Sequence, residues 1–190
     1  ANSMNSMDEG TNGNVNYNIA IGVESFIGGN LSTASTDVIG NIAIGAYALD
    51  ATSTNAQTGT IAIGHQALTA LTSGDGNTAV GYQSQDANTD SGKCTSVGYS
   101  SLGAVTTGGA SAGNTAVGYD AGLGITDGIY NTCMGWQSGD THNVTGAVYI
   151  GQASGSAGTG DYCIFVGMGA GETGNNTQDG TIGIGKSALA

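Results

Sequence analysis

The sequence predicts an all-β protein, a parallel β-roll or β-solenoid built from about ten short rungs. A five-residue motif recurs ten times along the 190 residues. Within the motif, large and small side chains alternate with the period of a β-strand, and its Ile, Val and Thr residues suit a pleated surface. Leu, Ile, Val and Phe together number only 33 residues. The chain therefore lacks the material for a thick core, and stacked repeats are the architecture that fits.

The motif is clearest in residues 77–81, Asn-Thr-Ala-Val-Gly, and every copy ends in a glycine. We number positions from this glycine, so that Val80 is position −1 and Tyr82 is position +1. Neighbouring motif glycines are 16 to 23 residues apart, so a constant block alternates with a connector of variable length. This pattern indicates stacked coils whose loops differ in reach. The structural glycines of the repeat are Gly22, Gly45, Gly64, Gly81, Gly98, Gly118, Gly135, Gly151, Gly167 and Gly185.

The alternation assigns a role to each position. Position −1 is Ile, Val or Met in every copy, so we expect it to fill a narrow core. Position −2 is Ala or Ser in the first six copies, which indicates a face that another backbone approaches closely. The glycine is expected to supply a positive φ or a steric gap where the chain turns into a second short strand. The Ala or Ser at position +3 would close the core from the opposite side.

The repeats cover residues 18–190, which we expect to form one β-solenoid domain. Residues 1–17 are polar and carry no motif, so they are either a disordered lead-in or a junction to another segment. Stacked asparagine amides can hydrogen-bond along a solenoid axis. Asparagine recurs at position −4, as Asn18, Asn41, Asn77, Asn114 and Asn131.

Composition argues against several function classes. With 14 acidic and two basic side chains, the formal net charge is −12, so the chain is not expected to bind nucleic acid. The sequence contains no apolar run of about 18 residues, which is the length that would predict a membrane-spanning segment. We expect no enzyme, no catalytic residue, no metal site and no cofactor, because neither an acid–base pair nor a metal-ligand spacing stands out. Cys94, Cys133 and Cys163 are isolated in sequence and favour assembly in a reducing cytoplasm over secretion.

The repeat resembles two related families. The blocks NTAVGYQS (77–84), NTAVGYDA (114–121) and NIAIGAYA (41–48) resemble the head repeats of trimeric autotransporter adhesins of the YadA type, and resemble more closely the shaft segments of bacteriophage tail fibres. The resemblance covers residues 18–190 and implies a left-handed parallel β-roll wound with two sister chains into an intertwined homotrimer. The repeat here is longer and less regular than that of adhesin heads, which implies extra loops. Copies eight to ten also depart from the pattern, with Tyr149, Phe165 and Gly183 at position −2.

Position +1 is aromatic in four consecutive copies, as Tyr82, Tyr99, Tyr119 and Trp136. At the strand spacing of about 4.8 Å, these rings would form a ladder if they are in register. One interpretation is a binding site in which the rings stack on sugars of a cell-surface glycan and their polar ends bind hydroxyls. The other is aromatic packing within the chain or at the trimer seam.

The resemblance implies a structural attachment protein: a segment of a bacteriophage tail fibre, located in the virion, that displays or contributes to host-surface binding. Its partners would be two copies of itself, other fibre or tail proteins and a cell-surface glycan. A bacterial trimeric adhesin head on the cell surface is one alternative. An ice-binding β-solenoid is another, because a flat threonine row can order water. That row is Thr78, Thr95, Thr115 and Thr132.

Overall fold

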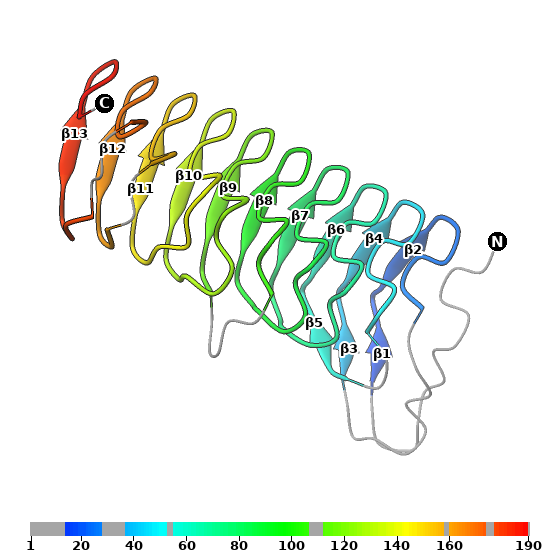
Figure 1. The fold of residues 1–190 in the computed structure, drawn as a ribbon. Helices are drawn as coiled ribbons and strands as arrows, with labels where there is room; N and C mark the ends of the chain where they lie inside the picture. Colours follow the sequence, from blue (N-terminus) through cyan, green and yellow to red (C-terminus); the bar gives the residue numbers. More distant parts are fainter. Residues whose placement is uncertain are drawn as a thin grey trace.

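The protein folds as a parallel β-solenoid (Figure 1). This is a computed structural model, and it describes residues 14–27, 37–52, 55–106, 112–157, 160–173 and 177–189. These ranges contain strands and turns and no helix. The predicted fold class, an all-β parallel solenoid, is therefore confirmed.

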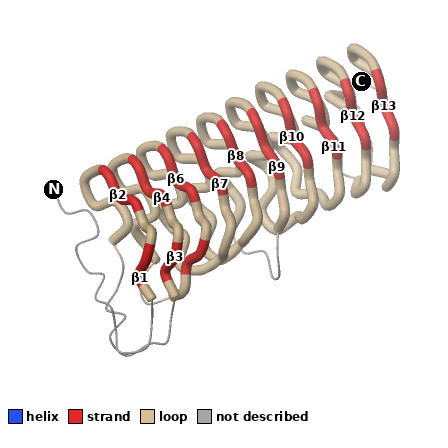
Figure 2. Tube along the Cα trace, turned by 180° about the vertical axis from the view of Figure 1, so that it is seen from behind, coloured by secondary structure: helices blue, strands red, loops and turns tan. Residues whose placement is uncertain are grey.

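One parallel sheet runs the length of the stack. Its ten strands follow one another in sequence order, each in register with the next. The ten strands of this sheet occupy one side of the coils, and turns and loops form most of the remainder (Figure 2). We call each strand with the turn that follows it a rung, numbered 1 to 10. The strands are β2 (Ile19–Ile21), β4 (Ile42–Ile44), β6 (Ile61–Ile63), β7 (Thr78–Val80), β8 (Thr95–Val97), β9 (Thr115–Val117), β10 (Thr132–Met134), β11 (Val148–Ile150), β12 (Ile164–Val166) and β13 (Ile182–Ile184).

A smaller parallel sheet precedes the first three rungs. It pairs β1 (Val15–Asn16) with β3 (Val38–Ile39), and β3 with β5 (Gln57–Thr58). Of the predicted lead-in, residues 1–13 lie outside the described ranges. Its last residues, from 14 on, are described and include β1.

Side chains in each strand alternate between the inside and the outside of the coil. Position −2 faces inward, and Ala62 and Ala79 are fully buried there. Positions −3 and −1 face outward, and at position −1 Val97 is 39% and Met134 is 42% exposed. The expectation that position −1 fills the core is therefore wrong. Because the side-chain period of a strand is two, position −1 shares the outer side with position −3, and the small residue between them lines the interior.

Two inward-facing positions of each rung, −2 and +4, line the interior. In most rungs one of the two carries a large side chain and the other a small one. In rungs 1 to 5, position −2 is Ala or Ser and position +4 is large; the large residues are Phe26, Leu49, Leu68, Gln85 and Leu102. In rungs 6 to 9, position +4 is glycine, and in the last three of these rungs position −2 becomes Cys, Tyr and Phe. Rung 10 returns to the first arrangement, with Gly183 and Leu189.

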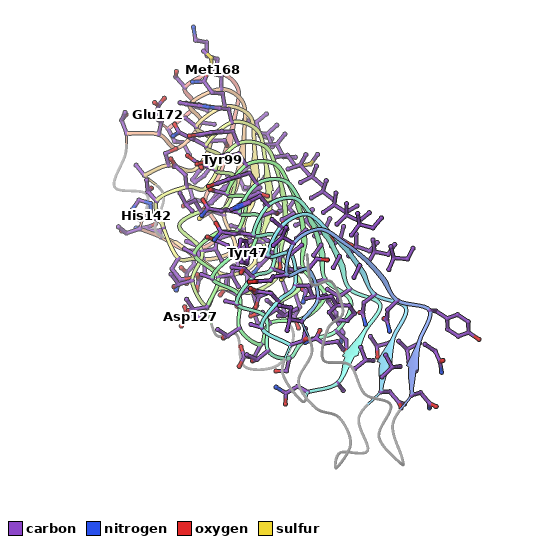
Figure 3. All side chains as sticks on the ribbon, turned by 90° about the vertical axis from the view of Figure 1, so that its right-hand side faces the viewer. Tyr47, Tyr99, Asp127, His142, Met168 and Glu172 are labelled. Carbon is purple, nitrogen blue, oxygen red and sulfur yellow. The ribbon has the colours of Figure 1, made fainter. Side chains whose placement is uncertain are left out.

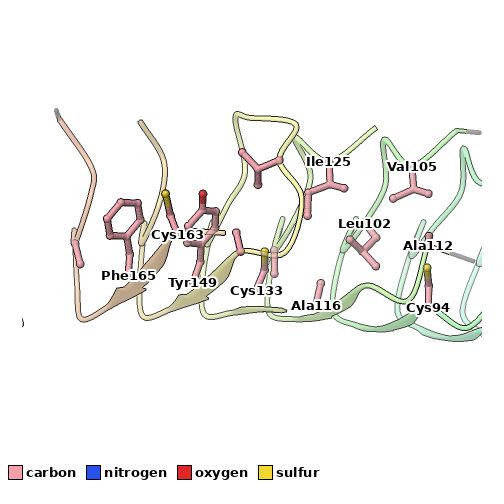
Figure 4. Packing of buried hydrophobic residues seen from close by; sticks show 14 residues of the cluster. Cys94, Leu102, Val105, Ala112, Ala116, Ile125, Cys133, Tyr149, Cys163 and Phe165 are labelled. Carbon is pink, nitrogen blue, oxygen red and sulfur yellow. The ribbon is translucent and has the colours of Figure 1, made fainter. Parts of the chain in front are cut away.

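Contacts in rungs 8 and 9 show why a large side chain at one position requires a small one at the other (Figure 4). Tyr149 and Phe165 are fully buried and stack with ring centroids 5.6 Å apart. A Cβ on Gly155 would lie 2.6 Å from the ring of Tyr149, and a Cβ on Gly171 would lie 2.7 Å from that of Phe165. Rungs 8 and 9 thus take their large interior side chain from position −2, and rungs 1 to 5 take it from position +4. In rung 6, where the two positions are Ala116 and Gly122, the side chains of Leu102 and Ile125 lie beside Gly122.

Successive backbones touch at the motif glycines. A Cβ on Gly151, whose φ is +126°, would lie 2.6 Å from the carbonyl oxygen of Gly167 in the next rung. The expected positive φ and steric gap are both confirmed. A tight turn follows each glycine in place of the second short strand that we expected. The Ala or Ser at position +3 is buried, as predicted, in rungs 1 to 9.

The turns of rungs 1 to 8 and of rung 10 also contain left-handed residues other than glycine. Gln83 at position +2 has a φ of 51° and Gln85 at position +4 has a φ of 53°. Their amides donate to the carbonyls of His65 and Ser101, at 3.0 Å in both cases. These bonds to the rungs on either side hold the backbone in a conformation that a glutamine seldom adopts on its own.

The asparagine column joins consecutive rungs, as predicted. Asn131 Oδ1 accepts from the amide of Ala147 at 2.8 Å, while its Nδ2 donates to the carbonyl of Val144 at 2.6 Å. Both partners belong to the next coil. The other four asparagines of the column also donate to a carbonyl of the next coil: Asn18, Asn41, Asn77 and Asn114.

Candidate functional site

Ring side chains from six consecutive rungs contact one another along the solenoid, and five of them are stacked. Centroid distances are 5.2 Å for His65–Tyr82, 5.1 Å for Tyr82–Tyr99 and 5.0 Å for Tyr99–Tyr119, with interplanar angles of 12° or less. Trp136 follows Tyr119 at 6.4 Å. The four aromatic residues singled out from the sequence are thus in register. We call the complete set the aromatic ladder: Tyr47, His65, Tyr82, Tyr99, Tyr119 and Trp136.

Backbone hydrogen bonds in the turns set the spacing of the ladder. The amide of Ser100 donates to the carbonyl of Tyr82 at 3.0 Å, and the amide of Asp120 donates to that of Tyr99 at 2.9 Å. Position +1 therefore repeats once per rung. In Figure 3, Tyr47 and Tyr99 follow the long axis of the stack.

Two members of the ladder were not identified from the sequence. His65 occupies position +1 of rung 3, so its place in the same column of the repeat as Tyr82 could have identified it. Tyr47 lies at position +2 and meets His65 edge-on, with centroids 6.0 Å apart and an interplanar angle of 77°. The sequence gives no sign of this contact, because Tyr47 is offset by one position and its backbone is left-handed, with a φ of 59°.

Stacking determines which parts of the rings are accessible. Tyr82, Tyr99 and Tyr119 are each 44% exposed, yet a neighbouring ring lies against both faces of each. Their accessible parts are consequently the ring edges that carry the phenolic oxygens. Trp136 is 49% exposed and ends the ladder, since position +1 of rung 8 is Gln152. Face-on stacking of a sugar is therefore closed at the three tyrosines, and at Trp136 the next residue of the column is the Gln152 side chain.

Polar side chains accompany the ladder at position +2. Gln83 Nε2 donates to Gln66 Oε1 at 3.0 Å, which links rungs 3 and 4. Ser100, Asp120 and Gln137 continue the row through rung 7. The ladder is thus bordered by hydrogen-bonding groups that are neutral except for one carboxylate.

Three aspartates follow at position +5, and burial raises the pKa of each: Asp50, Asp86 and Asp140. At Asp50, the hydroxyl of Thr69 donates to the carboxylate at 2.9 Å and partly opposes the shift. At Asp140, Oδ1 is buried without a hydrogen-bond partner. These carboxylates are therefore disfavoured in their charged form by the fold.

A second candidate surface is the outside of the ten-stranded sheet. Positions −3 and −1 form two columns that contain sixteen Ile, Val or Met residues and four Thr residues, none of them charged. Exposure is 39% at Val97 in the middle of the stack and reaches 71% at Ile184 in the last rung. We call these two columns the outer sheet face. It is continuous, uncharged and apolar except for the four threonines, on a chain whose net charge is −12.

The cysteines lie away from both surfaces. Cys94, Cys133 and Cys163 are buried and free, and burial raises the pKa of the Cys133 thiol to about 12. In the described ranges, no three His, Cys, Asp or Glu side chains gather as a metal site, and no pocket is present. Those ranges also contain no helix able to cross a membrane.

No family model, curated protein or solved structure matches this chain. The resemblance to adhesin heads and tail-fibre shafts accordingly rests on the repeat motif.

Proposed function

We propose that this chain is a structural segment of a fibre shaft, which assembles as a homotrimer through the outer sheet face. The observation that carries the proposal is the pair of uncharged, outward-facing columns over all ten strands. Monomeric soluble proteins rarely expose a continuous apolar surface of this kind. Burying it contributes about 25 cal/mol per Å² of apolar area, and no charge has to be desolvated in the process.

The geometry of the face suits a closed, parallel assembly. A rotation axis parallel to the solenoid keeps all copies pointing in the same direction and closes the contacts into a ring. Each chain in a trimer meets two neighbours, and the face offers two columns, one for each. The number three comes from the resemblance of the motif to trimeric shafts and heads.

The role that follows is mechanical: a rod that holds or displays a host-binding surface, as in a bacteriophage tail fibre of the virion. Its further partners would be other fibre or tail proteins. A bacterial adhesin head on the cell surface would use the same assembly. The three buried, unpaired thiols favour assembly in a reducing compartment, and hence the virion component over the secreted one.

One observation supports an ice-binding solenoid as a second candidate. Thr78, Thr95, Thr115 and Thr132 pair in register in adjacent strands, so the threonine row exists as predicted. The other outward column of the same strands, however, is Val or Met. Thermal hysteresis of the purified chain would support this candidate, whereas ordinary freezing would eliminate it.

Sedimentation equilibrium tests the assembly. The wild-type chain should have three times the 18.5 kDa mass of one copy. Val97→Glu, which places a carboxylate at the middle of the outer sheet face, should sediment as a monomer. Thr126→Glu adds the same charge on an exposed connector residue and should leave the trimer intact. A monomeric wild type, or a Val97→Glu variant that still forms trimers, would contradict the proposal.

A further inference from the structure

We propose that the aromatic ladder binds an uncharged β-1,4-linked polysaccharide chain laid along the solenoid axis. Sugar hydroxyls would contact the exposed edges of the tyrosine rings and of the Trp136 indole. This inference goes beyond the assembly role, and its residues are distinct from those of the outer sheet face.

The fold does not require aromatic rings at position +1. In rungs 1, 8 and 9 this position is Val23, Gln152 and Met168, and the carbonyls of these residues accept the same turn hydrogen bond at 2.8 to 2.9 Å. Rungs 2 and 10 carry Ala46 and Lys186 there. The turn therefore forms equally well without a ring at position +1, and the five rings of rungs 3 to 7 are not needed to build it.

The spacing of the rings selects an extended carbohydrate over an extended peptide. Phenolic groups recur at centroid spacings of 5.0 to 5.1 Å from Tyr82 to Tyr119. A fully extended, equatorially linked pyranose chain advances by a similar length per sugar. An extended peptide advances by only about 3.3 Å per residue, so its polar groups would fall out of step with the tyrosines.

The chemistry of the surface selects a neutral, hydroxyl-rich ligand. A phenol both donates and accepts hydrogen bonds, as does a glutamine amide, and a sugar hydroxyl needs both. The row beside the ladder consists of Gln66, Gln83, Ser100, Asp120 and Gln137. A net charge of −12 repels acidic polysaccharides and nucleic acids.

Trp136 is the last ring of the aromatic ladder. Tyr119 covers one side of its indole, and the next rung presents Gln152 in place of a ring. Trp136 is 49% exposed, and the edge of its indole offers apolar surface together with a ring N–H that can donate to a sugar hydroxyl. We therefore expect the tightest single contact at this end.

Calorimetric titration with two glucose hexamers tests the proposal. Cellohexaose has the extended β-1,4 linkage, whereas maltohexaose has the same sugar in a curled α-1,4 chain. Wild-type protein should bind cellohexaose at least about tenfold more tightly, which is about 1.4 kcal/mol. Affinity for shorter β-1,4 oligomers should rise with length up to about five sugars, the number of rungs from His65 to Trp136.

Variants locate the binding. A triple Tyr→Phe substitution at residues 82, 99 and 119 keeps the stack and removes three hydroxyls, so cellohexaose affinity should fall about tenfold. Trp136→Ala should lower it similarly, and Met168→Ala, an exposed residue of the same column outside the ladder, should not change it. Equal affinity for both hexamers, no binding of cellohexaose, or an unaffected triple variant would overturn the proposal. Sedimentation measures the oligomeric state independently of ligand binding. A protein that forms trimers but does not bind cellohexaose would therefore refute the polysaccharide site and leave the proposed trimer unaffected.

Discussion

Tyr149 and Gly155 share the interior of rung 8, and exchanging their sizes tests how the solenoid is packed. Tyr149 is fully buried, so Tyr149→Ala should lower the free energy of unfolding by about 3 kcal/mol. We take the lower end of the usual range because its hydroxyl already lacks a partner. Gly155→Leu should cost about 3 kcal/mol by overpacking, since even its Cβ would lie 2.6 Å from the tyrosine ring. The left-handed backbone is no obstacle, because Leu68 occupies the same position in rung 3 with a φ of 53°.

The double variant recreates the Ala–Leu arrangement of rung 3. Independent effects would add to about 6 kcal/mol, whereas we expect a loss of only about 2 kcal/mol, due mainly to the missing contact with Phe165. Urea titration at one chain concentration, followed by circular dichroism and Trp136 fluorescence, measures these values. Gly171→Leu is the matched control, because Gly171 packs on Phe165 and should not rescue Tyr149→Ala. Additive losses, or equal rescue by the control, would refute size exchange within a rung.

Three further substitutions test single interactions. Tyr149→Phe should raise the free energy of unfolding by about 1 kcal/mol, because it removes a buried hydroxyl without a partner; a lower melting temperature would contradict this. Asn131→Ala leaves a buried amide and carbonyl of the next coil unpaired and should cost about 3 kcal/mol, while the exposed Asn55→Ala should change stability by less than about 0.5 kcal/mol. Asp140→Asn should be more stable than wild type at pH 7. Burial raises the pKa of Asp140, so wild-type stability is greatest with the carboxyl protonated and falls as the pH rises through the raised pKa. The stability advantage of the variant should shrink as the pH is lowered from 7 towards 3.8. A difference in melting temperature between variant and wild type that stays constant over this pH range would contradict the raised pKa of Asp140.

The repetitive features of the fold could be predicted because each has a local physical cause. A Cβ at Gly151 would collide with the next backbone, so this position shows itself as glycine in every copy. The asparagine amide donates and accepts at once, which explains why it recurs where two coils must be joined. The register of the ladder likewise follows from a fixed offset to the glycine.

Features that depend on the thickness of the coil could not be predicted. We assigned the apolar residue at position −1 to the core on the assumption that large side chains lie inside. The interior of rung 4 instead holds Ala79 and Gln85, and Val80 lies on the outer side. A pattern of alternating large and small residues shows which residues of a strand share a side, but it does not show which of the two sides is buried. That choice depends on how many large residues the closed coil can hold and on what covers the other side.

The central claim is that the outer sheet face is covered by other copies of the chain. A spin label at Val97→Cys tests it directly, because the three native thiols are buried. Dipolar spectroscopy should show a short distance between labels on different chains at Val97, and a much longer distance for a label at Asp127→Cys on an exposed connector residue. Absence of dipolar coupling between chains at Val97 would show that this face is not the assembly surface.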